Sequence, residues 1–306
     1  MSFRSIIAPV EVTPRRASVE IFMCVLFWGA SFASMKVAVG EISPFVAVWF
    51  RLVFGMFIVV PAALYRGEFR RPFRDEVVPL VVLGFLGIAF HQNIQFAGMR
   101  EAGVANSNWL IAATPAAVAI LAWIFLKEKL NPLAIIGLLA SGAGVLLIVG
   151  GGTRGLGAFN PRAAGDILIA VSAVNWAVFQ ILSRRMLKDS SPTFSILWMN
   201  IFALAIQSGI VFIFSPRDFS GLLNVSVGGW CAVVFLGCVC SGLCYILWYD
   251  GLAVLTTAKV SAFLFLQPVI GVLVAYFFMG ERFTYLIYIG GALVLSGVWM
   301  VNNGKN

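Results

Sequence analysis

Charged side chains are scarce in this chain of 306 residues, and their scarcity excludes an ordinary soluble protein. They make up 11% of the sequence, whereas a typical soluble domain carries about 25%. Hydrophobic residues make up 61%, and the mean hydropathy is +0.97. This composition is typical of an all-α integral membrane protein whose helices are surrounded by lipid.

The sequence also lacks the motifs of catalysis and of resident cofactors. Its 5 cysteines follow no metal-binding spacing, and it has 1 histidine. The glycine-rich segment 150–157 lacks the Lys-Ser/Thr pair of a phosphate-binding loop. No nucleophile and base fall in a catalytic arrangement. We therefore expect no enzyme, no cofactor and no bound metal.

Long apolar stretches fill nearly the whole chain. A helix needs about 20 apolar residues to cross a bilayer core of about 30 Å. Ten stretches meet this requirement, at residues 18–39, 45–65, 77–98, 104–126, 132–150, 165–187, 193–214, 228–250, 257–279 and 285–301. The sequence therefore predicts ten transmembrane helices.

The second five stretches repeat the first five. With an offset of 153 residues, segment 97–148 falls on 250–301, and earlier in the chain the offset is 148. The matched pairs are Trp28 and Trp176, Gly98 and Gly251, Pro115 and Pro268, Glu128 and Glu281, Gly137 and Gly290, and Gly144 and Gly297. Because five is odd, the second set must cross the membrane in the opposite direction, as in many carriers.

This pattern predicts the organisation of the chain. We expect two inverted five-helix repeats at 18–150 and 165–301, joined by an external linker at 151–164. Short cytoplasmic tails are expected at 1–17 and 302–306. Glycine matches in the fifth and tenth stretches indicate close helix packing, within one chain or between two copies.

The net charge of +8 reports topology and gives no sign of a nucleic-acid partner. Arg and Lys gather in the segments that share a side with the N-terminus, such as 66–74 and 184–188. This is the positive-inside bias, and it predicts that both termini are cytoplasmic. The basic segments would contact the headgroups of membrane lipids.

None of the 13 acidic residues lies at the centre of an apolar stretch. Carriers driven by protons or sodium usually hold a carboxylate at the coupling site, so the sequence favours a facilitator. A proton-coupled mechanism would have to use His91, which lies well inside the third stretch and titrates near neutral pH in its ordinary state.

Polar and aromatic side chains at membrane depth are costly and are functional candidates. Arg51 has no central acid to pair with, so it could meet a substrate carboxylate in bidentate geometry. The alternative for the other polar groups is interhelical hydrogen bonding, and for the tryptophans it is packing. The candidate substrate-binding residues are Trp28, Arg51, His91, Gln95, Asn108, Trp109, Asn175, Trp176, Gln180, Tyr245, Tyr249 and Gln267.

A second group of residues is suited to gating. Pro115 and Pro268 remove a backbone donor at matching positions and would bend their helices, either as static kinks or as hinges. Glu128 and Glu281 would form either surface salt bridges or a latch made in one carrier state. Lys36 and Lys259 lie near helix ends, where they could gate or could extend toward the headgroups.

These residues resemble the drug/metabolite transporter superfamily, and within it the ten-helix EamA-type carriers. The resemblance rests on the Trp28-Gly29-Ala30-Ser31-Phe32 run before Lys36, on Ser43-Pro44 with Arg51 in the second stretch, and on Pro115 and Glu128 followed by Gly137 and Gly144. Within the family the chain is most similar to the amino-acid exporters of the YddG type. The resemblance implies a bacterial inner-membrane location and a central cavity, which the fifth and tenth helices support without lining.

The expected function is therefore export of amino acids, aromatic and other neutral ones first, or of related small metabolites by alternating access. A proton-coupled exporter of drugs or other metabolites is the alternative, followed by a channel or a lipid flippase. The expected partners are a small-molecule substrate and membrane lipids. The oligomeric state stays open, a monomer included.

Overall fold

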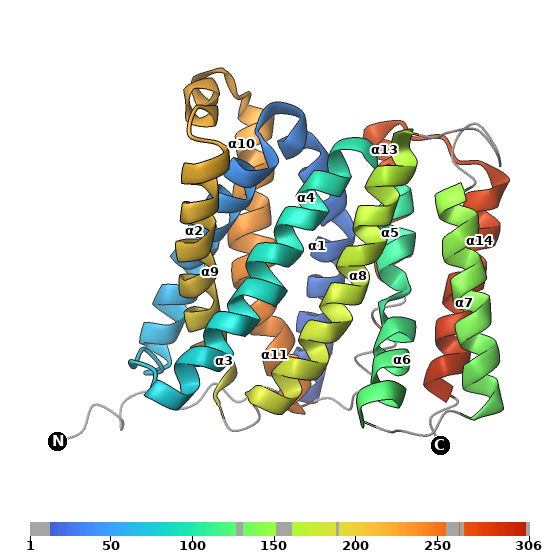
Figure 1. Ribbon diagram of the computed structural model, residues 1–306, viewed down its shortest axis with the longest axis horizontal. Helices are drawn as coiled ribbons and strands as arrows, with labels where there is room; N and C mark the ends of the chain where they lie inside the picture. Colours follow the sequence, from blue (N-terminus) through green and yellow to red (C-terminus); the bar gives the residue numbers. More distant parts are fainter. Residues whose placement is uncertain are drawn as a thin grey trace.

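The computed structural model describes residues 13–126, 131–150, 161–187, 190–254, 263 and 266–303. Every regular element in these ranges is a helix, and the helices form one bundle (Figure 1). The protein is an all-α membrane protein. Seven helical runs in the described residues are long and apolar enough to cross a membrane, and three shorter apolar helices accompany them at Pro132–Ile148, Leu266–Met279 and Tyr285–Val301. The total of ten spans stays a prediction.

The elements follow the predicted stretches closely along the chain. In order they are α1 (Pro14–Glu41), α2 (Pro44–Tyr65), α3 (Arg74–Gly84), η2 (Phe85–Phe90), α4 (His91–Glu101), α5 (Val104–Ala112), α6 (Thr114–Leu126), α7 (Pro132–Gly150), α8 (Pro161–Met186), α9 (Pro192–Phe214), η3 (Asp218–Asn224), α10 (Val227–Val234), η4 (Phe235–Leu243), α11 (Cys244–Val254), α13 (Leu266–Met279) and α14 (Tyr285–Asn303).

Several helices begin where a proline follows a hydroxyl residue. Thr13, Ser43 and Ser191 precede prolines that open α1, α2 and α9. A proline is tolerated at this position because its missing N–H has no partner inside the helix anyway. The Thr13 and Ser191 side chains also accept a hydrogen bond from a backbone N–H of the first turn.

The helix containing Pro115 is interrupted. Helix α5 ends at Ala112, and α6 begins at Thr114, directly before the proline. The Pro115 ring disfavours helical geometry in the preceding residue and removes a backbone donor. The result is a break between α5 and α6. Pro268, the matching proline, lies near the beginning of α13.

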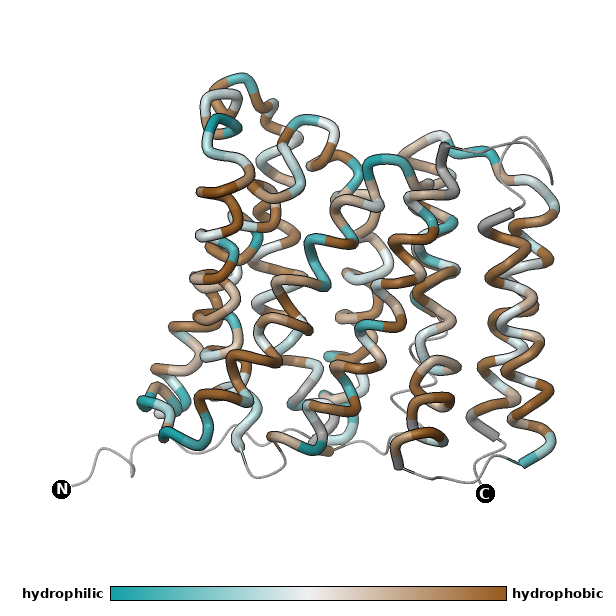
Figure 2. Tube along the Cα trace, in the orientation of Figure 1, coloured by the Kyte–Doolittle hydropathy of each residue, from teal (hydrophilic) through white to brown (hydrophobic). Residues whose placement is uncertain are grey.

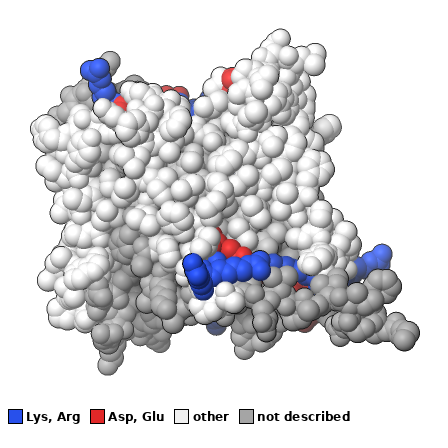
Figure 3. Space-filling model, turned by 180° about the vertical axis from the view of Figure 1, so that it is seen from behind, with Lys and Arg blue, Asp and Glu red and all other residues white. Residues whose placement is uncertain are grey.

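Polar residues mark the two ends of the bundle. Hydrophilic residues gather at both edges of the tube, and most of the length between them is hydrophobic (Figure 2). On the face opposite to the view of Figure 1, Lys and Arg lie near the edges, and the surface between is free of charge among the described residues (Figure 3). An uncharged band between two polar edges is the surface that a bilayer requires.

Helices α7 and α14 pack closely, and their glycines cross-pair. A Cβ on Gly137 would lie 2.5 Å from the carbonyl oxygen of Gly297, and a Cβ on Gly144 would lie 2.6 Å from that of Gly290. Gly290 is the repeat mate of Gly137, and Gly297 is the mate of Gly144. Gly137 therefore lies against the mate of Gly144, and Gly144 lies against the mate of Gly137. This is the pattern expected for two antiparallel helices related by a two-fold axis. The interface lies within one chain.

The same reciprocity holds elsewhere in the bundle. Gly98 of α4 packs against Gly165 of α8, and their mates Gly251 and Ala17 also lie in contact, through Ile21 and the backbone of Ala17. Helix α1 begins at the edge where α14 ends, whereas α8 begins at the opposite edge (Figure 1). These contacts are those of two halves with opposite orientations.

The third and eighth predicted spans each contain a π-helical segment at the same place. Segment η2 ends at Phe90 and η4 ends at Leu243, which are separated by the repeat offset. Helices α4 and α11 follow with 11 residues each. A π-helical segment is wider than an α-helix, and such segments are frequent at functional sites.

Candidate functional site

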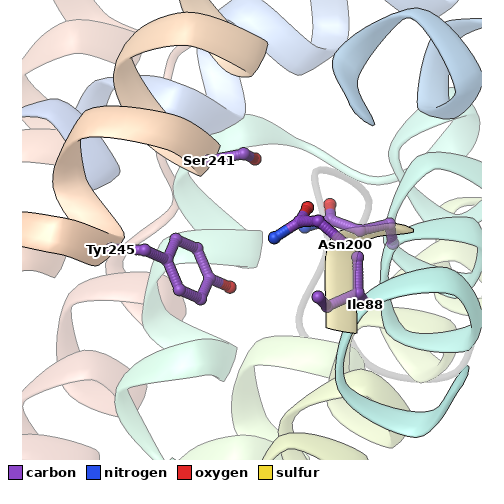
Figure 4. A pocket seen from close by; sticks show the side chains of 5 residues that line it. Ile88, Asn200, Ser241 and Tyr245 are labelled. Atoms are coloured by element: carbon purple, nitrogen blue, oxygen red, sulfur yellow. The ribbon is translucent and has the colours of Figure 1, made fainter. Parts of the chain in front are cut away.

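A small polar cavity lies between these two π-helical regions. It is lined by Ile88, Gln92, Asn200, Ser241 and Tyr245, and its volume is about 10 Å³, which is room for roughly one water molecule. Ser241 and Tyr245 reach into it from η4 and α11, opposite Asn200 and Ile88 (Figure 4). Pockets for drug-sized ligands usually measure about 300–1,000 Å³, so this conformation is closed around its centre.

The cavity lies on the pseudo-symmetry axis. Ile88 and Ser241 are repeat mates, and so are Gln92 and Tyr245, at the offset of 153 residues. Each half thus contributes the same two positions with different side chains. These four positions are symmetric in the repeat, whereas their side chains are not.

Arg51 lies immediately beside this cavity. Its Nε donates a 2.7 Å hydrogen bond to Oγ of Ser241, and its guanidinium lies 5.8 Å from the centre of the Phe96 ring. The residue is 5% exposed, and its Nη1 has no hydrogen-bond partner within the described parts of the chain. A buried cation with an unused donor is costly unless an anion completes its coordination.

Gln92 supplies the complementary group. Its side chain is 3% exposed, and its Oε1 is buried without a hydrogen-bond partner among the described residues. The site therefore holds an unused cationic donor beside Ser241 and an unused acceptor on the Gln92 side. This pair suits a ligand that carries an acidic group and a hydrogen-bond donor.

Tyr245 lies between the two matching tryptophans. Its ring centroid is 6.0 Å from that of Trp28 and 6.3 Å from that of Trp176, both in edge-to-face geometry. Trp28 also contacts Trp248 at 4.9 Å, and Trp176 contacts His91 at 4.9 Å. These aromatic residues thus pack mainly against one another, and Tyr245 is the one among them that lines the cavity.

Two of the predicted substrate ligands bond to carbonyls of the π-helical segments. Asn175 donates from Nδ2 to the carbonyl of Leu86 in η2, at 2.8 Å. Trp28 donates from Nε1 to the carbonyl of Cys240 in η4, at 3.1 Å. A side-chain donor at membrane depth must likewise find an acceptor inside the protein. The amide of Asn175 and the indole N–H of Trp28 therefore already donate to the protein backbone.

The side chains of the polar run 91–95 contact two different helices, α9 and α8. Asn93 and Gln207 of α9 pair through their amides at 2.6 and 3.2 Å, and Gln207 also donates to the carbonyl of Phe45. His91 and Gln95 are buried on the other side of the run, and the His91 ring contacts that of Trp176 at a tilt of 35°. Only Gln92 of this run lines the cavity.

Four further candidates lie away from the cavity lining. Asn108 packs on Gly271 of α13, and Trp109 packs on Gly291 of α14. Gln180 and the Gln267 side chain are half-buried outside it. The side chain of Tyr249, together with Glu128 and Lys259, lies outside the described residues.

Lys36 and Glu281 hold the turn between α4 and α5. The Nζ of Lys36 donates to the carbonyls of Met99, Arg100 and Ala102 at 2.9, 2.9 and 3.0 Å. The carboxylate of Glu281 accepts the N–H groups of Val104 and Ala105 at 2.8 and 3.1 Å. A cation thus caps the end of one helix, and an anion caps the start of the next, each at the favourable pole of the helix dipole.

Sequence reasoning missed Gln92, Asn200 and Ser241 as site residues, although it singled out the polar run 91–95 that contains Gln92. Asn200 is an isolated amide in the apolar α9 and is 4% exposed, a cost that could have marked it as a candidate. Ser241 offers no such signal, because small hydroxyl residues are common wherever membrane helices pack closely.

The comparisons with known proteins agree with this architecture. The model of the EamA-like transporter family matches residues 17–150 and 163–303. The chain belongs to the EamA-like transporter family. It is a multi-pass membrane transporter of the drug/metabolite transporter superfamily, whose members move small molecules. The predicted boundaries at 18–150 and 165–301 stay predictions.

Relatives in this family align over most of their lengths. The chain is 28% identical to the uncharacterized transporter YyaM of Bacillus subtilis, with 89% of each protein covered. It is 24% identical to a probable terminal-alkyne amino-acid exporter of Streptantibioticus cattleyicolor, with 92% of each covered. A crystal structure with 21% identity superposes with a TM-score of 0.67, over 94% of this chain and 96% of the other, which shows a shared fold.

Proposed function

We propose that this protein exports amino acids, aromatic and other neutral ones in particular, or related small metabolites across the bacterial inner membrane by alternating access, with both termini in the cytoplasm. The observation that carries the proposal is the unused guanidinium donor of Arg51 beside a polar cavity on the pseudo-symmetry axis. A substrate carboxylate would complete this group, and the free acceptor of Gln92 would take a donor such as the substrate ammonium. The amino-acid exporter among the relatives supports the same substrate class.

We propose further that transport is facilitated rather than driven by protons. Within the described residues no acid lines the cavity. His91 is buried, and its Nδ1 has no hydrogen-bond partner among the described residues, so a charged imidazole would be poorly compensated at this depth. His91 would therefore serve as a neutral wall residue.

Transport by the purified protein in liposomes tests this proposal. We expect saturable flux of a labelled neutral amino acid without any proton gradient, reduced by competing unlabelled amino acids. Flux that strictly requires the gradient would support the proton-coupled alternative. Unsaturable, voltage-driven current would indicate a channel, and movement of labelled lipid between leaflets would indicate a flippase.

We propose that the capped α4–α5 turn is the latch of the closed external side. Helix α1 supplies Lys36, and the segment after α13 supplies Glu281, so this turn can separate from the rest of the bundle only when both caps break. Gly280, with a φ of 64°, reverses the chain after α13 and directs Glu281 back to α5. Glu281 thus forms a helix cap, and no ion pair of this residue occurs among the described residues.

Replacing Glu281 by alanine is expected to speed amide exchange in the segment 102–108 by about 10-fold or more, because two N–H groups lose a charged acceptor. Hydrogen–deuterium exchange with mass spectrometry measures this directly. Arg282→Gln is the matched control, since the neighbouring Arg282 is exposed. Equal exchange in the wild type and in Glu281→Ala would contradict the latch.

A further inference from the structure

The loop between α2 and α3 is fixed to its surroundings by alternate charged residues. The carboxylate of Glu68 accepts hydrogen bonds from Oγ of Ser191 and the N–H of Phe194, at 2.6 and 3.2 Å. Arg66 pairs with Asp250 of α11. These contacts hold the loop against the beginning of α9 and against α11.

The far end of the loop is equally ordered. Arg70 donates both Nη groups to Glu76, at 2.7 and 2.6 Å, and its guanidinium lies 3.9 Å from the ring centre of Phe194. Its carbonyl accepts a 2.8 Å hydrogen bond from Nε1 of Trp198. The Glu76 carboxylate also accepts the N–H of Phe73 at the start of α3. The charges of Arg66, Glu68, Arg70 and Glu76 are thus committed to the fold.

The remaining side chains of the loop face outward. Phe69 is 50% exposed and Phe73 is 67% exposed. Arg71 and Arg74 are exposed, and no ion pair of either occurs in the described parts of the chain. Asp75 is the one exposed acid of this segment, so the outward charge is positive by one. Two aromatic rings and two guanidinium groups therefore alternate on a rigid edge.

This edge lies where the membrane surface must be. It joins the ends of two apolar spans, Pro44–Tyr65 and Arg74–Glu101, and Tyr65 before it is 58% exposed. Aromatic side chains are favoured at the level of the headgroups, and arginine binds phosphate oxygens in bidentate geometry. The loop that matches it in the second half, at 215–226, carries a single arginine, Arg217.

We propose that the loop 66–74 is a binding site for the phosphate headgroup of an anionic phospholipid. Arg71 and Arg74 hold the phosphodiester, while Phe69 and Phe73 insert at the boundary of the acyl chains. The site belongs to the leaflet at the edge where α1 begins and α14 ends (Figure 1). It does not depend on the substrate of the central cavity.

Retention of phosphatidylglycerol by the purified protein in detergent, measured by native mass spectrometry, tests this site. We expect phosphatidylglycerol to bind more tightly than phosphatidylcholine. Each of Arg71→Gln and Arg74→Gln should weaken its binding by roughly five-fold, and the double variant by about 25-fold. Neither arginine forms an ion pair with any residue that the structure describes, so the variants should remain folded.

Arg217→Gln, at the opposite edge, is the matched control and should retain wild-type lipid binding. Equal losses in Arg217→Gln and in the double variant would overturn the proposal, because the binding would then follow net charge alone. Unchanged binding in the double variant would also overturn it. Addition of inorganic phosphate distinguishes the two sources of the phosphate group: full competition by free phosphate at millimolar concentration would contradict a lipid site.

Discussion

Replacing Arg51 by glutamine is expected to lower the transport of a carboxylate-bearing substrate by about 30-fold or more. The guanidinium is buried, and its Nη1 is unused. Truncating one partner of a buried, hydrogen-bonded charge pair costs about 2–5 kcal/mol, and each 1.4 kcal/mol is a factor of ten. Counterflow of a labelled amino acid in proteoliposomes measures the loss.

Two controls separate recognition from folding. Arg51→Lys keeps the positive charge but loses the planar fork, so we expect partial transport with weakened substrate binding. Ser241→Ala removes the Nε partner and should have a smaller effect than Arg51→Gln. Thermal unfolding of Arg51→Gln should be close to that of the wild type, because an unpaired buried charge contributes little stability. Unchanged transport in Arg51→Gln would place the substrate elsewhere.

Replacing Gly137 by leucine is expected to destabilise the protein by about 3 kcal/mol or more. Its Cβ alone would lie 2.5 Å from the carbonyl oxygen of Gly297 and 2.8 Å from Cβ of Met300. The two backbones of α7 and α14 must therefore separate, and the contact of Gly144 with Gly290 would be lost with them. Thermal unfolding monitored by size-exclusion chromatography measures the effect.

Gly142 offers a control within the same helix. A Cβ on Gly142 would meet nothing within 4 Å, so Gly142→Leu should leave the folded yield and the unfolding temperature close to those of the wild type. Similar losses in Gly137→Leu and Gly142→Leu would show that the α7–α14 interface does not depend on the close approach of its glycines.

The membrane class, the positions of the apolar stretches and the repeat follow from the sequence alone. Hydrophobicity is a sum over neighbouring residues, so a run such as 45–65 reveals a span without any knowledge of its partners. An offset such as 153 residues likewise needs only the order of prolines, acids and glycines. Such properties depend only on neighbouring residues or on their order, so they can be recognised in the sequence whatever the arrangement of the helices.

The sequence also placed Arg51 correctly as a buried cation without a central acid. The same reasoning indicated polar groups that the fold uses for itself, since Asn175 and Trp28 bond to the carbonyls of Leu86 and Cys240. The π-helical segments that contain these carbonyls leave no clear signature in an apolar run. Residues beyond them are rotated relative to a regular helix, so rules of helical spacing no longer identify a shared face.

The sequence by itself thus determined that this chain is a membrane protein with a repeat and a buried arginine. The tertiary structure decided which polar groups remain unused. Asn93 is occupied by Gln207, whereas Arg51 and Gln92 keep a free donor and a free acceptor beside the cavity. Whether a buried group is satisfied depends on partners more than a hundred residues away, and only the packed bundle brings those partners together.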